Sequence, residues 1–358
     1  MPGALPHGPA DRAPAAAVVP AGTFVAAGLV VMWSSGFIGA GLGTRYAGAD
    51  TLLMWRFLVA TALLGGLWLL LRRRRLPARA VAEQSVVGLL SQGVYLGSTV
   101  WAVGLGVPPG TSALIAALQP LAAGALSGRL VGETVSRRQW AGLAIGLAGV
   151  AMVVRDDLSA SAAVQSWAYA LPFAGMAGLL AASFLERRAR RPLPATDALP
   201  LHCLVSALVF TGVALAAGPG HAAPPVTAGF WLAVAWVVLL STVGGYGFYW
   251  LSLRRDGVTR TSALIYLTPP TTAVWAYAMF GEAPGPLALA GMAVSLAGVV
   301  VAVRRSPATT RTGQAEPAGR PVRTGEAKEP QRSPARYERH DRDDSWLEPS
   351  PDRDPRCG

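Results

Sequence analysis

Long apolar runs alternate with short polar breaks along the chain from Gly22 to Val303. A helix that crosses the hydrocarbon core of a bilayer, ~30 Å thick, needs about 20 mostly apolar residues, because each residue adds ~1.5 Å. Ten segments satisfy this requirement, near residues 22–41, 51–71, 85–104, 110–127, 138–154, 164–185, 198–217, 228–251, 259–280 and 286–303. The pattern therefore predicts an all-α membrane protein with ten transmembrane helices.

The third, fourth and sixth of these segments are rich in glycine and alanine. Small residues let helix backbones approach closely in lipid, where apolar helices gain little from leaving the solvent. We therefore expect a closely packed bundle, and a homodimer formed through such helices stays an open alternative.

Charged residues are scarce and unevenly placed. Only 14% of the 358 residues are charged and 52% are hydrophobic, whereas soluble domains carry roughly a quarter charged residues. The net charge of +11 could indicate a nucleic-acid partner, but the arginines border bilayer-length apolar runs rather than one aromatic-studded face. Such arginines are typical of loops that face anionic lipid, so we expect the lipid bilayer as a partner and no nucleic acid.

The two ends of the chain differ from its apolar body. Residues 1–21 are rich in Pro and Ala and lack the basic region that begins a cleaved signal peptide. Residues 304–358 are rich in Arg, Pro, Asp, Glu and Ser and hold too few aliphatic residues to bury. We interpret both segments as disordered and the second as a solvated tail, with lipid binding or docking of a partner as the alternative.

Arginine is distributed asymmetrically between alternate loops. One set of loops contains 15 arginines, whereas the opposite set contains only Arg45 and Arg155. The larger set consists of Arg72, Arg73, Arg74, Arg75, Arg79, Arg129, Arg137, Arg138, Arg187, Arg188, Arg190, Arg191, Arg254, Arg255 and Arg260. Because Lys and Arg accumulate in cytoplasmic loops, this set predicts the cytoplasmic face of a multi-pass protein of the cell membrane. With ten helices, both termini are then cytoplasmic.

The chain also contains an internal repeat. The pentapeptide Thr111–Ile115 recurs 150 residues later as Thr261–Ile265, and Pro120 recurs as Pro270. At a spacing of 149 residues follow Gly132-Glu133 with Gly281-Glu282, Gly142 with Gly291, and Ala148-Gly149 with Ala297-Gly298. An ordered series with one single-residue shift predicts two five-helix halves, residues 22–154 and 155–303.

Because five is an odd number, the second predicted half enters the membrane in the opposite sense to the first. Inverted repeats of this kind are typical of secondary transporters. Two similar halves related by an axis in the membrane plane can open a central site to one side and then to the other. The alternative is an inert duplicated scaffold.

A set of short motifs runs through both halves, over residues 22–303. The motifs are Trp33–Phe37, Arg56-Phe57, Thr111–Pro120, Gly132-Glu133, Arg254-Arg255, Ser262–Leu264, Pro269-Pro270 and Gly281-Glu282. As a set they resemble the drug/metabolite transporter superfamily, specifically its EamA-type ten-helix permeases. The resemblance implies export or uptake of small metabolites such as amino acids and their relatives, and it leaves the substrate open.

Proline marks the middle of two predicted helices. Pro120 lies in the fourth, and Pro269-Pro270 lies in the ninth. Proline removes a backbone donor and frees carbonyl groups that a neighbour, a water molecule or a ligand must satisfy. A simple kink is the alternative, but the recurrence in both halves favours Pro120 and Pro270 as substrate-binding residues.

Polar and aromatic residues at a similar depth complete the predicted substrate site. They are Trp33, Ser34, Gln92, Tyr95, Thr99, Gln119, Tyr246 and Tyr266. A polar group in hydrocarbon is costly unless it is paired, so these side chains should face the bundle interior. We favour Gln92 and Gln119, because an amide offers donors and acceptors to a zwitterionic solute. For the aromatic residues packing is the alternative, and Phe248, Tyr249 and Trp250 are interpreted as an interfacial belt.

Arg56 is the one arginine clearly inside a predicted helix, about 7 Å from its outer end by helical rise. Its side chain could snorkel to the outer headgroups or bind a carboxylate or phosphate. No Asp or Glu falls in the middle of a predicted helix, so a buried cationic substrate would lack a countercharge. A neutral, zwitterionic or anionic metabolite is therefore expected. Glu133 and Glu282 follow glycine at helix ends and are interpreted as caps or as partners of loop arginines.

Motifs of catalysis and cofactor binding are missing from the sequence. The four histidines and two cysteines are scattered without metal-ligand spacing, and there is no phosphate loop or nucleophile elbow. We expect no catalytic residue, metal or cofactor, but a secondary transporter that moves a small-molecule substrate by alternating access. The alternatives are an exporter of cationic drugs, an intramembrane enzyme and a non-transporting regulatory membrane protein.

Overall fold

The computed structural model describes residues 21–71, 75–131, 136–160, 164–189 and 193–303, and every regular element in these ranges is helical. Helices satisfy all backbone groups within one segment, which suits apolar sequence in lipid. Outside the described residues lie the terminal segments up to residue 20 and from residue 304, together with Arg72–Arg74, Arg190, Arg191 and Glu133.

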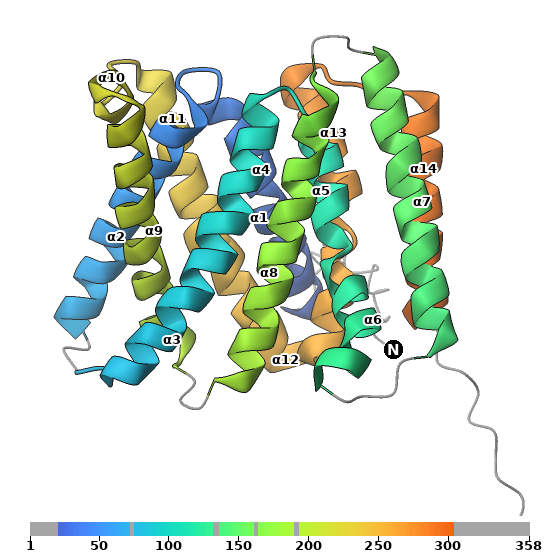
Figure 1. Cartoon of the computed structure of the whole chain (residues 1–358), viewed down its shortest axis with the longest axis horizontal. Coiled ribbons are helices and arrows are strands. Elements are labelled where there is room, and N and C mark those ends of the chain that lie inside the picture. Colours follow the sequence, from blue (N-terminus) through green and yellow to red (C-terminus); the bar gives the residue numbers. More distant parts are fainter. Residues whose placement is uncertain (1–20, 72–74, 132–135, 161–163, 190–192, 304–358) are drawn as a thin grey trace, which may run out of the picture. The chain divides into compact units, whose positions relative to one another are not determined.

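The first half of the described chain, up to residue 160, contains helices α1 to α7 (Figure 1). Their bounds are α1 Ala21–Gly43, α2 Ala49–Leu71, α3 Ala78–Gly88, the π-helical segment η1 Leu89–Val94, α4 Tyr95–Gly104, α5 Pro109–Ala117, α6 Gln119–Val131 and α7 Arg137–Ala160. Helices α3, η1 and α4 are continuous, and α5 and α6 meet at Leu118.

The second half repeats this order. Its elements are the 3₁₀ turn η2 Ser166–Tyr169, α8 Ala170–Arg188, α9 Ala195–Ala217, α10 Pro219–Ala222, α11 Ala228–Trp236, the π-helical segment η3 Val237–Gly245, α12 Tyr246–Ile265, α13 Thr268–Phe280 and α14 Pro286–Val303. Gly257 interrupts α12 with a φ of 76°, a left-handed conformation that glycine adopts without strain.

Seven helical stretches among the described residues are long and apolar enough to cross a membrane. The three further predicted segments overlap helices that do not meet both conditions. In α7, charged residues at both ends reduce the hydropathy. The predicted segment around α13 is divided at Gly257 and Leu267. In α14 the apolar part is short. Ten helices were predicted, and seven satisfy length and composition.

Helices α7 and α14 pack through four glycines, which we call the glycine seam: Gly142, Gly149, Gly291 and Gly298. A methyl group at Gly142 would lie 2.5 Å from the carbonyl oxygen of Gly298, and one at Gly298 would lie 2.6 Å from that of Gly142. Gly149 and Gly291 face each other's carbonyl oxygens in the same way. The two backbones therefore touch directly, as small residues allow.

The glycine seam also relates the two halves. Gly142 meets Gly298 while Gly149 meets Gly291, so α7 and α14 run antiparallel. In the sequence repeat, Gly142 corresponds to Gly291 and Gly149 corresponds to Gly298. The contact between Gly142 and Gly298 is therefore equivalent to the contact between Gly291 and Gly149. This exchange is the property of a two-fold, isologous interface. The same relation holds elsewhere, since α1 packs on η3 and α12, α4 packs on α8, and α2 packs on α9.

Candidate substrate-binding cavity

Two π-helical segments lie at equivalent places in the two halves. Segment η1 joins α3 to α4, and η3 joins α11 to α12. Such segments are rare and are found frequently at functional sites, because the extra residue per turn reorients neighbouring side chains. A signal for them exists in the sequence, where Leu89–Ser91 recurs as Leu239–Ser241 at the repeat spacing of 150 residues.

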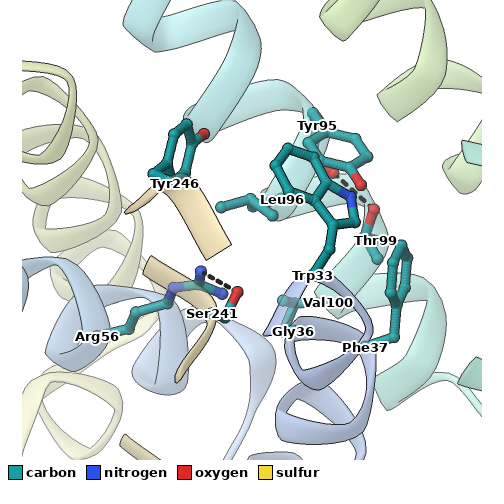
Figure 2. A pocket seen from close by; sticks show the side chains of 10 residues that line it. All are labelled: Trp33, Gly36, Phe37, Arg56, Tyr95, Leu96, Thr99, Val100, Ser241 and Tyr246. Carbon is teal, nitrogen blue, oxygen red and sulfur yellow. Dashed lines mark hydrogen bonds between the residues drawn. The ribbon is translucent and has the colours of Figure 1, made fainter. Parts of the chain in front are cut away.

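A small cavity, partly open to its surroundings, lies beside η3, between α1, α2, α4 and the start of α12 (Figure 2). Five predicted site residues line it: Trp33, Arg56, Tyr95, Thr99 and Tyr246. Gly36, Phe37, Leu96, Val100 and Ser241 complete the wall. We call this space the Arg56 cavity, after the charged residue in its wall.

The guanidinium of Arg56 is buried, with only 2% of the residue exposed. Its Nη2 donates to the hydroxyls of Ser241 at 3.4 Å and Thr242 at 3.3 Å, and Figure 2 shows the first of these bonds. Its Nε has no hydrogen-bond partner among the described residues, and no described carboxylate forms an ion pair with it. A buried position does not fit a side chain that snorkels to the headgroups, so Arg56 presents an uncompensated positive charge to the cavity.

Gln92 comes from η1 and is completely buried. Its Nε2 donates to the hydroxyl of Tyr246 at 2.6 Å, which ties η1 to the start of α12. Its Oε1 has no partner among the described residues. Thr99 donates to the carbonyl of Tyr95 one turn earlier, at 2.8 Å. Gln92 therefore holds a wall residue of the Arg56 cavity and does not line that cavity itself.

A second small cavity shares Trp33, Phe37 and Tyr95 with the first. Gln119 lines it and donates to the hydroxyl of Ser183 at 3.1 Å. Tyr249 lines it as well, with its ring centroid 5.4 Å from that of Trp33. The structure thus places Tyr249 in the interior rather than in the interfacial belt, because its ring turns toward α1.

The remaining predicted residues lie apart from the Arg56 cavity. Tyr266 and Pro270 line a mostly apolar cavity between α5, α13 and α14, and Pro270 is exposed. Pro120 is half-buried in the first turn of α6. Ser34 is buried and donates to the carbonyl of Thr268 at 3.3 Å, which joins α1 to α13.

The prolines follow equivalent breaks in the two halves. Helix α5 ends before Leu118, whose N–H donates to the carbonyl of Ile115 at 3.1 Å. Helix α12 ends before Leu267 in the same way, with a 3.0 Å bond to Leu264. Both are the tighter bonds of a 3₁₀ turn, three residues apart. The prolines therefore begin a new helix after each break.

An acidic cavity lies at the far end of α7. Thr111 donates to Asp157 Oδ2 at 2.6 Å, and Glu282 lines the same space. Burial raises the pKa of Asp157 to about 6, although the hydrogen bond from Thr111 opposes this shift. Burial also raises the pKa of Glu282, and the charge of Arg45 lowers it. No ion pair between Glu282 and an arginine occurs among the described residues, so the interpretation of Glu282 as such a partner stays a prediction.

The sequence pattern of the EamA-like transporter family matches the chain twice, over residues 20–155 and 165–304. Together the two matches cover most of the chain and every helix described above except the last residues of α7. The chain belongs to the EamA-like transporter family. Both halves of this family member carry one copy of the family unit, which confirms the resemblance found from the short motifs.

Two curated relatives are transport proteins by name. The chain is 29% identical over 284 residues to a "Probable terminal-alkyne amino-acid exporter" of Streptantibioticus cattleyicolor, covering 77% of this chain and 91% of that protein. It is 27% identical over 255 residues to the "Uncharacterized inner membrane transporter YedA" of Escherichia coli K12, covering 71% and 81%. The chain is therefore similar to integral membrane transporters along most of its length.

A solved crystal structure shares the fold. It aligns with a TM-score of 0.55 and 20% sequence identity, over 79% of this chain and 97% of the other. At that identity the likeness concerns the fold alone.

Proposed function

We propose that this EamA-like protein is a secondary transporter that exchanges an amino acid or a related carboxylate between the two sides of the cell membrane by alternating access. The family and the relatives support the transport of small metabolites. The amino-acid class is supported by the name of the Streptantibioticus relative and by the chemistry of the Arg56 cavity. The names of these relatives describe transport rather than a chemical reaction, which supports our expectation that this protein has no catalytic residues.

The observation that carries this proposal is the buried, uncompensated charge of Arg56. Removal of a guanidinium from water is expensive unless an anion pairs with it. A substrate carboxylate would accept bonds from Nε and Nη2, and charge-assisted bonds of this kind are the strong ones. Tyr95 and Trp33 lie across the cavity and can cover the rest of a small solute (Figure 2).

We also propose that ten helices cross the membrane, as two inverted halves. The antiparallel glycine seam supports this arrangement, since an axis that exchanges two antiparallel helices is perpendicular to both and therefore lies in the membrane plane. Under this proposal α7, α13 and α14 cross the membrane in addition to the seven apolar stretches.

The proposed cytoplasmic face is the lower end of the bundle in Figure 1. The end of α2, the start of α3, the end of α8 and the start of α9 lie there. Exposed arginines lie at these helix ends and on α12. They are Arg79, Arg187, Arg188, Arg254 and Arg255. Their accumulation supports cytoplasmic termini by the positive-inside rule.

Comparison of the metabolites of cells with and without the protein tests the function, followed by counterflow of the candidate solutes in vesicles that contain the purified protein. We expect a small set of amino acids or related carboxylates to change, and to exchange only with protein present. Removal of residues 304–358 should leave this exchange intact. Accumulation of a lipophilic cation driven by a pH gradient, and unaffected by Arg56→Ala, would instead favour a drug exporter.

Labelling of an introduced cysteine tests the topology. Leu76→Cys, in a chain whose Cys203 and Cys357 are replaced by serine, should react with a membrane-impermeant maleimide only after the cells are opened. Gly48→Cys, at the opposite end of α2, is the matched position that should react from outside. Reaction of Leu76→Cys in intact cells would reverse the proposed orientation.

A further inference from the structure

We propose that an apolar groove between α2, α9 and α12 holds the hydrocarbon chain of a substrate whose carboxylate binds Arg56. The substrate class is an amino acid with an extended apolar side chain. This inference rests on the proposed transport function and specifies which part of the protein selects its substrate.

The groove has about 1330 Å³ of unoccupied space, part of it open to the surroundings. One side of the groove is formed by Leu64, Leu67, Trp68 and Leu71 of α2, and another by Pro194, Ala195, Thr196, Leu199 and Pro200 at the start of α9. The third side is formed by Val243 of η3 and by Gly247, Trp250, Leu251 and Arg254 of α12. Apart from Thr196, Arg254 and the hydroxyl of Tyr246 the wall is apolar, as hydrocarbon requires.

The groove and the Arg56 cavity meet at Tyr246. This residue lines both spaces, and the bond from Gln92 holds its hydroxyl. A solute in the Arg56 cavity therefore lies beside the groove. Its charged end can reach Arg56 while its apolar end passes Tyr246 and enters the groove.

Charge decides between a free amphiphile and a membrane lipid as the occupant. An acyl chain of a bilayer lipid would fill the groove, but it would leave the guanidinium of Arg56 without an anion. A carboxylate with an apolar chain satisfies both spaces at once, because it neutralises Arg56 and removes its own methylenes from water. A cation would be repelled by Arg56 and gain nothing from the apolar wall beyond burial.

Binding of a homologous series to the full-length protein in nanodiscs tests the inference. The probes are L-2-aminobutyrate, norvaline, norleucine and L-2-aminooctanoate, measured by calorimetry, with counterflow in vesicles as the transport readout. Burial of one methylene corresponds to a gain in affinity of roughly three- to fourfold. We expect this gain for each added methylene until the chain fills the groove. Norleucinol, which has a hydroxyl in place of the carboxylate, should bind at least about tenfold more weakly than norleucine.

Two matched substitutions on α2 locate the chain. Leu67 lines the groove and is 50% exposed, whereas Leu63 is 44% exposed on the same helix and does not line it. Leu67→Trp should cancel the gain for norleucine and L-2-aminooctanoate and leave L-2-aminobutyrate unchanged. Leu63→Trp should leave the whole series unchanged.

The possible outcomes distinguish a failure of the groove proposal from a failure of the transport proposal. If short amino acids exchange but affinity does not rise with chain length, the groove proposal is wrong and the transport proposal stands. Equal affinities for norleucine and norleucinol, or an equal loss in both tryptophan variants, would indicate partition into lipid and overturn the groove proposal. If no amino acid of the series binds or exchanges, the groove proposal is wrong, whereas the transport proposal falls only if no amino acid or related carboxylate exchanges in the counterflow experiment described above.

Discussion

Helices α2 and α9 are equivalent elements of the two halves, and each carries a basic side chain at the same position. Both have 23 residues, Leu58-Val59 of the first recurs as Leu204-Val205 in the second, and Arg56 corresponds to His202. Arg56 reaches η3 of the other half through Ser241 and Thr242. His202 reaches α3 of the other half through Gln84. Each side chain therefore contacts the other half, but at a different place, since Ser241 corresponds to Ser91 and Gln84 corresponds to Val234.

The surroundings of the two side chains are different. His202 Nε2 lies 2.8 Å from Gln84 Oε1, and Gln84 Nε2 donates to Glu186 Oε2 at 2.8 Å. An imidazole can be neutral, so this network needs no buried charge. Arg56 is always charged, and among the described residues its hydrogen bonds are two long ones to hydroxyls. The two halves share the packing of α2 on α9, whereas the buried guanidinium, to which the proposed function assigns the substrate charge, is present in the first half and replaced by an imidazole in the second.

The largest effect that the comparison predicts is for Arg56→Gln. Loss of two charge-assisted hydrogen bonds to a carboxylate, each worth about 1.5 to 3 kcal/mol, should reduce counterflow per molecule at least about 100-fold. Membrane abundance should not fall, because a neutral amide is cheaper to bury than a guanidinium. Uptake measured against protein amount checks this result, with Arg56→Lys as a partly active variant. Normal counterflow by Arg56→Gln would contradict the assignment of the substrate carboxylate to Arg56.

Positions in the glycine seam should respond alike, because both halves contribute equally. In Gly149→Ala and in Gly298→Ala the new methyl group meets backbone atoms of the opposite helix. Each variant should lose about 1 to 3 kcal/mol of stability through overpacking. Gly212→Ala is the control, since nothing lies within 4 Å of its added methyl group. Thermal denaturation in detergent measures the difference, and unequal losses at the two seam positions would contradict the two-fold relation.

A smaller effect is expected for His202→Ala. The substitution leaves Gln84 Oε1 buried without its partner, which should cost on the order of 1 kcal/mol. Counterflow per molecule should stay within about twofold of the parent, because the comparison assigns the substrate charge to Arg56 alone. A loss of transport as large as that of Arg56→Gln would instead make the two basic residues functionally equivalent.

The smallest effect concerns Asp157, where the two halves share a cavity through Thr111 and Glu282. A carboxyl with a raised pKa favours the folded state at acid pH, and this contribution is lost as pH rises from the unfolded value through about 6. Asp157→Asn removes the dependence. The variant should therefore melt at a higher temperature than the parent at pH 7.5 and at a similar temperature at pH 4.5. A difference in melting temperature that is the same at both pH values would show that the effect of the substitution does not come from ionisation of Asp157.

Half of the residues that line the Arg56 cavity could be predicted from the sequence, and the polar residues that were missed share one cause. Five wall residues were predicted because polar or aromatic residues inside a membrane helix should face the interior of the bundle. They are Trp33, Arg56, Tyr95, Thr99 and Tyr246. Ser241 and Thr242 were missed because ordinary hydroxyls in an apolar helix can satisfy themselves on the preceding turn.

Depth alone also misplaced residues relative to the cavity. Tyr266 and Pro270 were grouped with Trp33, Tyr95 and Tyr246 because all were placed at a similar depth in the membrane. The structure separates them, since depth does not say toward which neighbour a helix face turns. Tyr249 shows the reverse, as it lies near a helix end by sequence and yet packs on Trp33.

By itself the sequence determined the helical class, the duplication, the family and the identity of the buried charge. These follow from properties that are local or periodic: bilayer-length apolar runs, motifs at constant spacing, and a single arginine within such a run. Only the tertiary structure decided which side chains converge around Arg56 and that the groove meets its cavity at Tyr246. The reason is physical, because convergence depends on the rotation of each helix about its axis, and two π-helical segments change that rotation within the helices that line the site.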